Sequence, residues 1–515
     1  MNIKTETHSF QRNLSVAGHY DLIVCGGGPS GVPAALAAAR NGLKVLLIES
    51  SGQLGGAGVS AGVSHLLGCR AVDNSCWAVA GLLKEVTEDL AAIGGAIHPE
   101  TIKPEKYSPH GWTGAISTLT YGVPFDPVAM SALLDRKMLE AGVDVLFFTQ
   151  FVDVEITDSR IQKIIVSNKS GLLAYGTRVV VDATGDADVA WRAGCDYVKG
   201  REGDELMAPA SLIFHVNNVD QDALASEIYR TNSYRFRELI QRLRESGEWT
   251  FPYEIFISVQ LHEKGTLMIN TTRHCDVDGT DGASVSKGMI RGRSEMIELF
   301  ALMRKYFPGF KDARIKMVAS SLGVRETRRI RSDFVYRVQD ILNATDFPDT
   351  IAWSAYGWDL PDPKRPSHQP MHGGKTELRR LVTPIPYRCL VPRPIKNLIC
   401  PGRAISVERD VLGPLREQGP CYAMGHAAGI AAAMSLKSGV SFADVDITRL
   451  QEKLIAEGAV VNDPLQPKSQ PSPNGKKRDG RPEPLPGASP SDSVSPFETA
   501  TNTSDAEDIP VLVNQ

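Results

Sequence analysis

Blocks of apolar and polar residues predict a strand–helix–strand unit near the start of the chain. Tyr20–Cys25 (YDLIVC) is a short apolar run of the kind that forms a buried parallel strand. Pro33–Arg40 is rich in alanine and predicts a helix, which ends at Asn41-Gly42. Lys44–Glu49 (KVLLIE) is a second apolar run. In this order the segments predict a βαβ unit.

Later apolar runs predict more strands and then a change of character. Strands are expected at 143–148, 152–156, 163–167 and 178–182, with a hairpin turn at 168–171. From about Met207 to Arg380, helical stretches at 222–248 and 287–306 alternate with a β-like segment at 265–271 and with loops. A short strand at 398–400 and a helix at 418–435 follow.

This order predicts an α/β fold in which a smaller domain interrupts a nucleotide-binding domain. The larger domain is expected to be Rossmann-like, a parallel sheet plus a β-meander, and the insertion to be an α+β substrate or cap domain. The proline-rich end of the chain cannot bury enough apolar surface to fold. The expected parts are a flexible arm (1–18), the first part of the nucleotide domain (19–206), the substrate domain (207–384), the rest of the nucleotide domain (385–461) and a disordered tail (462–515).

Composition excludes several classes of partner. The chain of 515 residues has a net charge of −4, which gives no basic field for nucleic acid. No apolar run approaches the roughly 18 residues of a membrane span, and the polar first residues do not resemble a secretory signal. The eight cysteines are scattered singly, without the spacing of a metal site or a disulfide frame. A cytoplasmic protein without a bound metal is therefore expected.

The glycine-rich turn after the first strand carries the clearest chemical signal. Gly26-Gly27-Gly28-Pro29-Ser30-Gly31 fits G-x-G-x-x-G. In such a motif Gly26 permits the tight turn, Gly28 lets the backbone approach a pyrophosphate, and Gly31 allows close packing of helix on strand. The start of the helix then offers free N–H groups to the phosphates. Glu49 lies 21 positions after Gly28, where a carboxylate can accept hydrogen bonds from a ribose.

Several further segments indicate which dinucleotide binds. After Glu49 the chain continues with five residues and then Gly55-Gly56. This start resembles the flavoprotein superfamily that includes glutathione reductase and fumarate reductase. Four more segments resemble the group called FAD-dependent oxidoreductases, and the resemblance spans about 20–458. They are VVDATGDADVAWRAG (180–194), SLGVRETRRI (321–330), IPYRCL (385–390), and the range 397–433, which contains NLICPGRAIS and GPLREQGPCYAMGHAAGIAAA. The resemblance implies FAD as the cofactor.

The resemblance also implies where FAD would be contacted. The adenosine end would lie at the Gly26–Glu49 region, including Pro29 and Ser30, and Gly55-Gly56 would pass close to the ribityl or ring portion. The backbone of Val152 would meet the adenine. Other contacts, with the pyrophosphate, the ribityl–phosphate part and the flavin ring, would come from Gly185, Asp186, Gly402, Arg403 and the helix that begins near Gly419.

The reaction expected is hydride transfer between flavin N5 and a small organic substrate. The sequence has a single strand-linked G-x-G-x-x-G and no C-x4-C pair, so no built-in NAD(P)H domain is expected. Oxygen, a quinone or a separate electron carrier would then be the second redox partner. Two alternatives remain open: an FAD-dependent monooxygenase or hydroxylase, and a non-catalytic Rossmann-type nucleotide-binding protein.

Three residues are the candidates on the substrate side. His65 follows the glycine-rich loop and could transfer protons. Arg325 belongs to a dense charged group, Arg325-Glu326 and Arg328-Arg329, and could bind a carboxylate or phosphate. A salt-bridged structural role is the competing interpretation for that group. Arg388 precedes the segment that returns to the flavin and could form a pocket wall.

Overall fold

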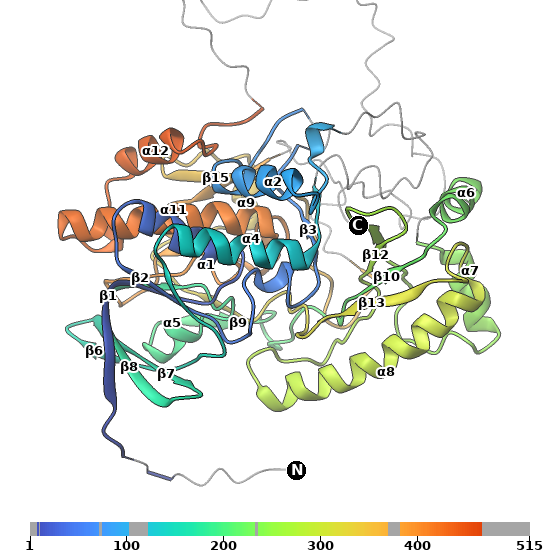
Figure 1. The fold of residues 1–515 in the computed structure, drawn as a ribbon, viewed down its shortest axis with the longest axis horizontal. Helices are drawn as coiled ribbons and strands as arrows, with labels where there is room; N and C mark the ends of the chain where they lie inside the picture. Colours follow the sequence, from blue (N-terminus) through green and yellow to red (C-terminus); the bar gives the residue numbers. More distant parts are fainter. Residues whose placement is uncertain are drawn as a thin grey trace, which may run out of the picture.

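The computed structural model describes residues 8–9, 11–71, 75–101, 122–231, 235–368 and 382–465. The predicted tail lies outside the described residues from 466 onward. The described chain forms two bodies: a larger one around a long sheet, and a smaller one built from the green and yellow segments at the right of Figure 1.

The large sheet has seven strands in the order β5-β2-β1-β8-β7-β6, with β17 paired to β8. Strands β5, β2, β1, β8 and β17 are parallel, whereas β6, β7 and β8 form an antiparallel meander. The strands are β1 (Ser15–Cys25), β2 (Val45–Ile48), β5 (Asp144–Leu146), β6 (Gln150–Thr157), β7 (Arg160–Asn168), β8 (Gly171–Asp182) and β17 (Leu398–Ile399). This topology confirms the predicted α/β fold class.

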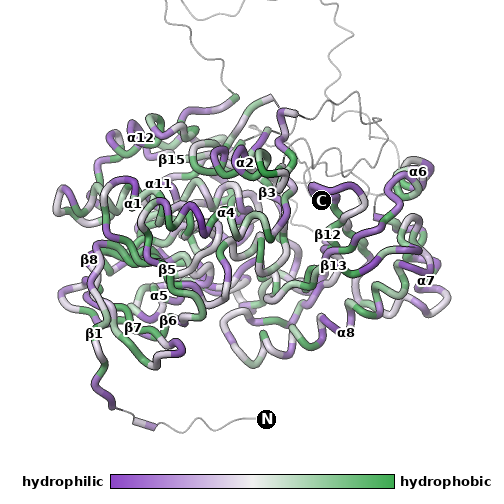
Figure 2. The backbone as a smooth tube through the Cα atoms, in the orientation of Figure 1, coloured by the Kyte–Doolittle hydropathy of each residue, from purple (hydrophilic) through white to green (hydrophobic). Residues whose placement is uncertain are grey.

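Alternate residues of the parallel strands face two different cores. Leu22 and Val24 belong to one hydrophobic cluster, whereas Ile23 and Cys25 belong to another. The first cluster lies under helices α1 (Gly31–Arg40), α2 (Leu82–Ala92), α4 (Pro127–Glu140) and α11 (Gln418–Ser438), and the second includes α5 (Asp188–Arg192). Figure 2 shows hydrophobic stretches along the sheet strands and more polar stretches on outer helices such as α6 and α12.

Helices α1 and α11 cross at very short range because α11 carries glycines there. A Cβ on Gly425 would lie 2.1 Å from the carbonyl oxygen of Ser30, and one on Gly429 would lie 2.3 Å from that of Ala34. No larger residue fits at either position without moving a helix. The contact brings the starts of both helices to the same end of the parallel sheet, where ligands bind in such folds.

The smaller body has its own sheet and its own core, made by residues between 210 and 322. Its strands lie in the order β11 (Ser258–Gln260), β12 (Leu267–Ile269), β10 (Phe214–Asn217) and β13 (Arg314–Val318). Helices α6 (Gln221–Thr231), α7 (Arg237–Glu245) and α8 (Gly282–Tyr306) accompany it. The predicted continuous helix over 222–248 is thus two helices, and Phe236, with a left-handed φ of 53°, precedes the second.

Two predicted boundaries need correction. Strand β1 begins at Ser15, where it pairs with β8, so the arm predicted for 1–18 ends earlier. The segment predicted as an insertion, 207–384, is longer than the second core. After residue 327 the chain returns to the larger body, because β14 (Arg328–Ile330) pairs with β9 (Tyr197–Lys199) and Tyr336 and Ile351 lie in the first core.

The remaining elements complete the larger body. They are β3 (His65–Leu66), β4 (Val123–Pro124), α9 (Val338–Leu342), β15 (Thr350–Ser354), β16 (Thr383–Pro386), α10 (Leu412–Leu415) and α12 (Ile447–Ala456). Within the described ranges, no helix is both long enough and apolar enough to cross a membrane.

Candidate active site

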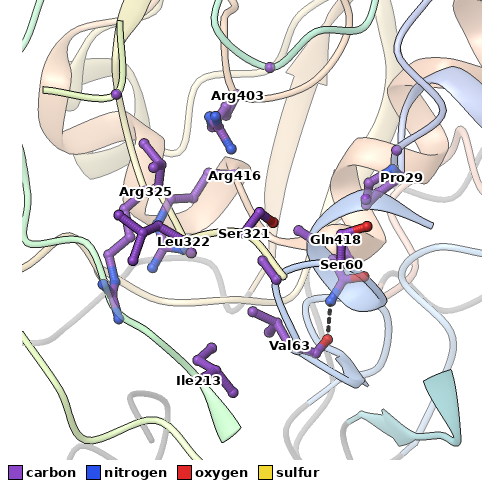
Figure 3. A pocket seen from close by; sticks show the side chains of 18 of the residues that line it. Pro29, Ser60, Val63, Ile213, Ser321, Leu322, Arg325, Arg403, Arg416 and Gln418 are labelled. Atoms are coloured by element: carbon purple, nitrogen blue, oxygen red, sulfur yellow. Dashed lines mark hydrogen bonds between the residues drawn. The ribbon is translucent and has the colours of Figure 1, made fainter. Parts of the chain in front are cut away.

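A cavity of about 870 Å³ lies between the two bodies. One side is lined by the turn after β1, the end of β2 and the starts of α1 and α11, and the other by residues of the smaller sheet. Figure 3 shows Pro29, Ser60 and Gln418 on one side of the pocket and Leu322, Arg325 and Arg416 on the other. The cavity therefore borders both the glycine-rich motif and the predicted substrate domain.

The glycines of the motif have the geometry that the sequence predicts. Gly26 has a φ of +105°, and a Cβ there would lie 2.4 Å from the carbonyl oxygen of Ala183. A Cβ on Gly31 would lie 1.8 Å from the carbonyl oxygen of Gly26, so helix and strand pack closely. Gly28, Pro29 and Ser30 line the cavity. A Cβ on Gly28 would meet only the Cα of Gly56, at 3.8 Å, which leaves space for a ligand beside the backbone.

Glu49 lies at the end of β2 and lines the cavity. One carboxylate oxygen accepts the N–H of Gly27 at 2.7 Å, and the other accepts the N–H of Ser51 at 2.7 Å. These bonds fix the carboxylate beside the glycine-rich turn. The oxygen that accepts from Ser51 also accepts the hydroxyl of Ser50 at 3.2 Å. The oxygen that accepts from Gly27 can take a further hydrogen bond, so Glu49 can also receive a ribose hydroxyl there.

The two glycines after Glu49 have different positions. Gly56 lines the cavity, and a Cβ there would lie 2.7 Å from the Cα of Gly28. Gly55 does not line it. Gly55 donates its N–H to the carbonyl of Gly27 at 2.9 Å, and its φ of +105° turns the loop back against the motif.

The opposite wall of this part of the cavity comes from two distant segments. Gly185 and Asp186 follow β8, Gly402 and Arg403 follow β17, and all four line the cavity. The guanidinium of Arg403 pairs with Asp186 at 2.6 Å. Its buried Nε has no hydrogen-bond partner among the described residues. This N–H is available to an anionic ligand.

Four of the predicted cofactor residues lie outside the cavity lining: Gly31 and Gly55, described above, and Val152 and Gly419. Val152 is on β6, and its neighbours Gln150 and Phe151 line the cavity in its place. Gly419 faces the segment 67–69, since a Cβ there would lie 2.6 Å from the carbonyl oxygen of Leu67. The start of α11 reaches the cavity through Gln418 instead, whose amide donates to the carbonyl of Val63 at 2.7 Å (Figure 3).

Comparison with known proteins decides the family. The sequence model of a family described as FAD dependent oxidoreductase matches residues 21–454. The chain belongs to this family. FAD is therefore its cofactor, and the protein is an oxidoreductase. The search of curated proteins found no match.

Solved structures of low similarity cover most of the chain. A geranylgeranyl bacteriochlorophyll reductase-like protein from Thermoplasma acidophilum is 14% identical, with a TM-score of 0.42 over 86% of this chain and 84% of that chain. The p-nitrophenol 4-monooxygenase of Pseudomonas putida DLL-E4 is 12% identical, with a TM-score of 0.43 over 85% and 83%. At these values neither says anything about the reaction of this chain.

The cavity fits FAD on its own geometry. The open side of Gly28, the carboxylate of Glu49 and the Nε of Arg403 offer space, an acceptor and a donor for a dinucleotide in one cavity. The start of α1 borders the same space, since Ser30 at its N-cap lines the cavity, and the free N–H groups of a helix start favour phosphate. In the described part of the chain, no cluster of three or more His, Cys, Asp or Glu could hold a metal ion.

The three residues predicted on the substrate side do not lie together. His65 is buried on β3 and lines the cavity, as does Arg325. Arg388 does not line it. The Arg388 guanidinium lies 4.2 Å from the ring centre of Phe334 and 3.5 Å from the carboxylate of Asp349, with much of the side chain exposed.

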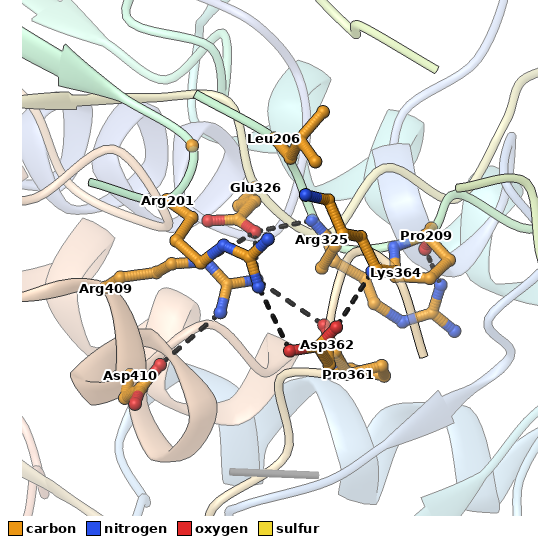
Figure 4. A network of polar contacts seen from close by, with 12 residues as sticks. Arg201, Leu206, Pro209, Arg325, Glu326, Pro361, Asp362, Lys364, Arg409 and Asp410 are labelled. Carbon is orange, nitrogen blue, oxygen red and sulfur yellow. Dashed lines mark hydrogen bonds and ion pairs between the residues drawn. The ribbon is translucent and has the colours of Figure 1, made fainter. Parts of the chain in front are cut away.

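The four charged residues of the group around Arg325 make different contacts; Figure 4 shows Arg325 and Glu326, with Arg409 beside Glu326. Glu326 is fully buried and accepts from Arg409 Nε at 3.0 Å and from the N–H of Ala208 at 2.5 Å. Arg328 pairs with Asp188, and Arg329 donates to the carbonyl of Gly200. Buried ion pairs thus hold this segment in place, and among the four charged residues of the group only Arg325 lines the cavity.

Sequence reasoning missed Arg273 and Tyr356, which also line the cavity. Arg273 stands in a polar run, Asn270 to His274, directly after the apolar strand β12. Such a run at the end of a strand is a usable signal for a site. Tyr356 follows β15, and only the tertiary fold brings it to Arg325 and Arg416.

Proposed function

We propose that this protein transfers a hydride between N5 of FAD and a small organic substrate held in the same cavity. The observation that carries the proposal is the continuity of that cavity. It reaches from Glu49 and the glycine-rich turn to Arg325 and the smaller sheet. A space shared by cofactor and substrate supports direct transfer, which needs the reacting atoms within about 3.5 Å of each other.

The chain's own residues would bind, orient and move a proton. Bound FAD supplies an atom that accepts or donates a hydride. Gly28 and Gly56 leave room for its pyrophosphate and ribityl parts, and Glu49 accepts from its ribose. We assign to His65 the proton that accompanies the hydride, because its ring is buried on the cavity wall.

The second half-reaction is assigned to oxygen, a quinone or a separate electron carrier. The single G-x-G-x-x-G of the sequence is already used for FAD. We therefore expect NADH or NADPH to reduce the flavin slowly and without saturation. Rapid, saturable reduction by either at micromolar levels would contradict this assignment.

The experiment is anaerobic reduction of the purified flavoprotein by a panel of small organic compounds. The reduction is monitored as the loss of the visible absorbance band of the flavin. We expect at least one compound to bleach the flavin. His65→Gln should slow that bleaching by roughly 10²- to 10⁴-fold with unchanged FAD content, as for loss of a general acid or base. In a parallel reaction under air, incorporation of an oxygen atom from O2 into the product would instead indicate a hydroxylase.

A further inference from the structure

Two buried arginines stand side by side at the end of the cavity away from the glycine-rich turn. Arg273 is 5% exposed and Arg325 is 9% exposed. Each donates from Nη1 to the same hydroxyl oxygen, that of Ser211, at 3.0 Å. Arg273 also donates to the carbonyl of Asn270, and Arg325 to the side chain of Asn270. The two cations are therefore held next to each other by neutral oxygens.

No carboxylate of the described residues lies within ion-pair distance of either arginine, and Asp359 acts on both only at longer range. Among the residues that the structure describes, the buried Nε of Arg273 has no hydrogen-bond partner. The nearby carboxylates belong to a third arginine: Arg416 pairs with Asp359 at 3.0 Å and with Glu417 at 2.8 Å. Arg235 adds a further cation to the cavity lining.

Such an arrangement is costly in the absence of an anion. Burial, with the neighbouring Arg416, lowers the pKa of Arg325 to about 10. Burial and the charge of Arg325 hold the pKa of Arg273 well below its usual range. Buried charges normally have counter-ions, so two adjacent cations with free N–H capacity facing a cavity indicate a site for a negative ligand group.

Apolar side chains also line this part of the cavity, namely Ile213, Ile257, Met268 and Leu322. The planar N–H pairs of guanidinium groups match a carboxylate, and the apolar wall suits a hydrocarbon body. We propose that Arg273 and Arg325 form the anion-binding subsite for the substrate, an organic acid with an apolar body and a carboxylate head. This inference rests on the proposed function, because it names the substrate class of the same cavity.

The test is binding of model acids to the FAD-loaded protein. Benzoate and hexanoate should raise its thermal unfolding temperature and perturb its flavin absorbance, and benzamide should do neither. Arg273→Gln and Arg325→Gln should each weaken benzoate binding by roughly 10- to 100-fold, the loss expected for a hydrogen bond to a charged group. Arg314→Gln, on the exposed side of β13, is the matched control and should bind benzoate unchanged.

Lysine variants distinguish a loss of benzoate contacts from a loss of binding caused by disturbed structure. Arg273→Lys and Arg325→Lys keep the charge and lose the paired N–H geometry, so each should bind benzoate more tightly than its Gln counterpart. FAD content and circular dichroism show whether each variant is folded. Unchanged binding in all four variants, equal binding of benzamide, or no binding of either acid would overturn the subsite. Tighter binding of phenyl phosphate than of benzoate would overturn the carboxylate class.

The outcome is separable from that of the proposed function. Arginine-dependent benzoate binding without flavin reduction by any organic acid would leave the subsite standing and refute the hydride transfer. Flavin reduction by a neutral compound, with no arginine-dependent binding of acids, would support the hydride transfer and refute the subsite.

Discussion

The side of Gly28 that faces the cavity leaves open space in which a ligand can lie. Valine there would fill the space beside the backbone that FAD needs, without a clash inside the protein fold. We expect Gly28→Val to abolish FAD retention while the circular dichroism spectrum stays unchanged. The measurement is the ratio of flavin to protein after purification.

Gly282→Ala provides the control for the loss of a glycine, because a Cβ at that position would meet nothing within 4 Å. It should retain FAD fully. A Gly28→Val protein that retained FAD would contradict the assigned place of the cofactor.

Single residues also show what sequence could and could not predict. Gly26, Gly28 and Gly31 were predictable because their role is conformational and is set by neighbours in sequence. Arg273 was not, since its significance comes from Arg325, which is brought beside it through Ser211. Arg388 fits no local rule that would have separated it from Arg325, and only the fold shows it outside the cavity.

Helix α11 depends on its two small contact positions with α1. Valine at Gly425 would have to displace the carbonyl of Ser30, so we expect Gly425→Val to destabilise the protein by roughly 1–3 kcal/mol, the usual cost of overpacking. Urea unfolding measures this. Ser438→Val, on the exposed last turn of the same helix, is the control for placing a valine in α11 and should change stability little. Valine has a higher helix propensity than glycine, so propensity cannot explain a loss at Gly425.

One carboxylate of helix α2, that of Glu85, contacts both neighbouring helices, and Asp89 of the same helix also pairs with Lys137. Glu85 accepts from Arg40 of α1 and from Lys137 of α4, at 2.8 and 2.6 Å. Chiefly through the hydrogen bond with Arg40, these contacts lower its pKa to about 2 from an ordinary 4.5. A lowered carboxyl pKa stabilises the fold above pH 4.5, and that contribution is lost as pH falls toward 2.

Glu85→Gln should therefore lower the thermal unfolding temperature at pH 7. The loss should be on the order of 1 kcal/mol or less, because solvent screens a partly exposed pair. The difference from the unmodified protein should shrink as pH falls below 4.5. Glu88→Gln, which affects only the exposed pair with Lys84, should change little at any pH. A Glu85 effect independent of pH would contradict the ionic explanation.

Elements were predicted best where the pattern was long and local. The βαβ unit and the hairpin of β7 and β8 correspond to clear runs of apolar residues. The segment after residue 327 was assigned to the wrong core because its strands are short and pair with distant partners. Such pairing has no periodic signal in the sequence.

The cavity joins both bodies of the molecule, so its ligand should stabilise both. FAD that binds the folded state alone raises the free energy of unfolding by about 2.7 kcal/mol at a hundred times its Kd. We expect the unfolding temperature of the deflavinated protein to rise steadily with added FAD, with one transition throughout. Differential scanning calorimetry checks this. An unfolding temperature independent of FAD would contradict a site between the two bodies.

The walls of the cavity are far apart along the chain, and this has a consequence for biosynthesis. The glycine-rich turn ends at Gly31, whereas Gly402 and Gln418, which also line the cavity, come almost 400 residues later. Because a ribosome releases the chain from its N-terminus, the turn emerges long before the residues that enclose it. The cofactor can be captured only when nearly the whole chain has been made. Flavin loading is thus a late step, and protein made when flavin is scarce can be filled afterwards.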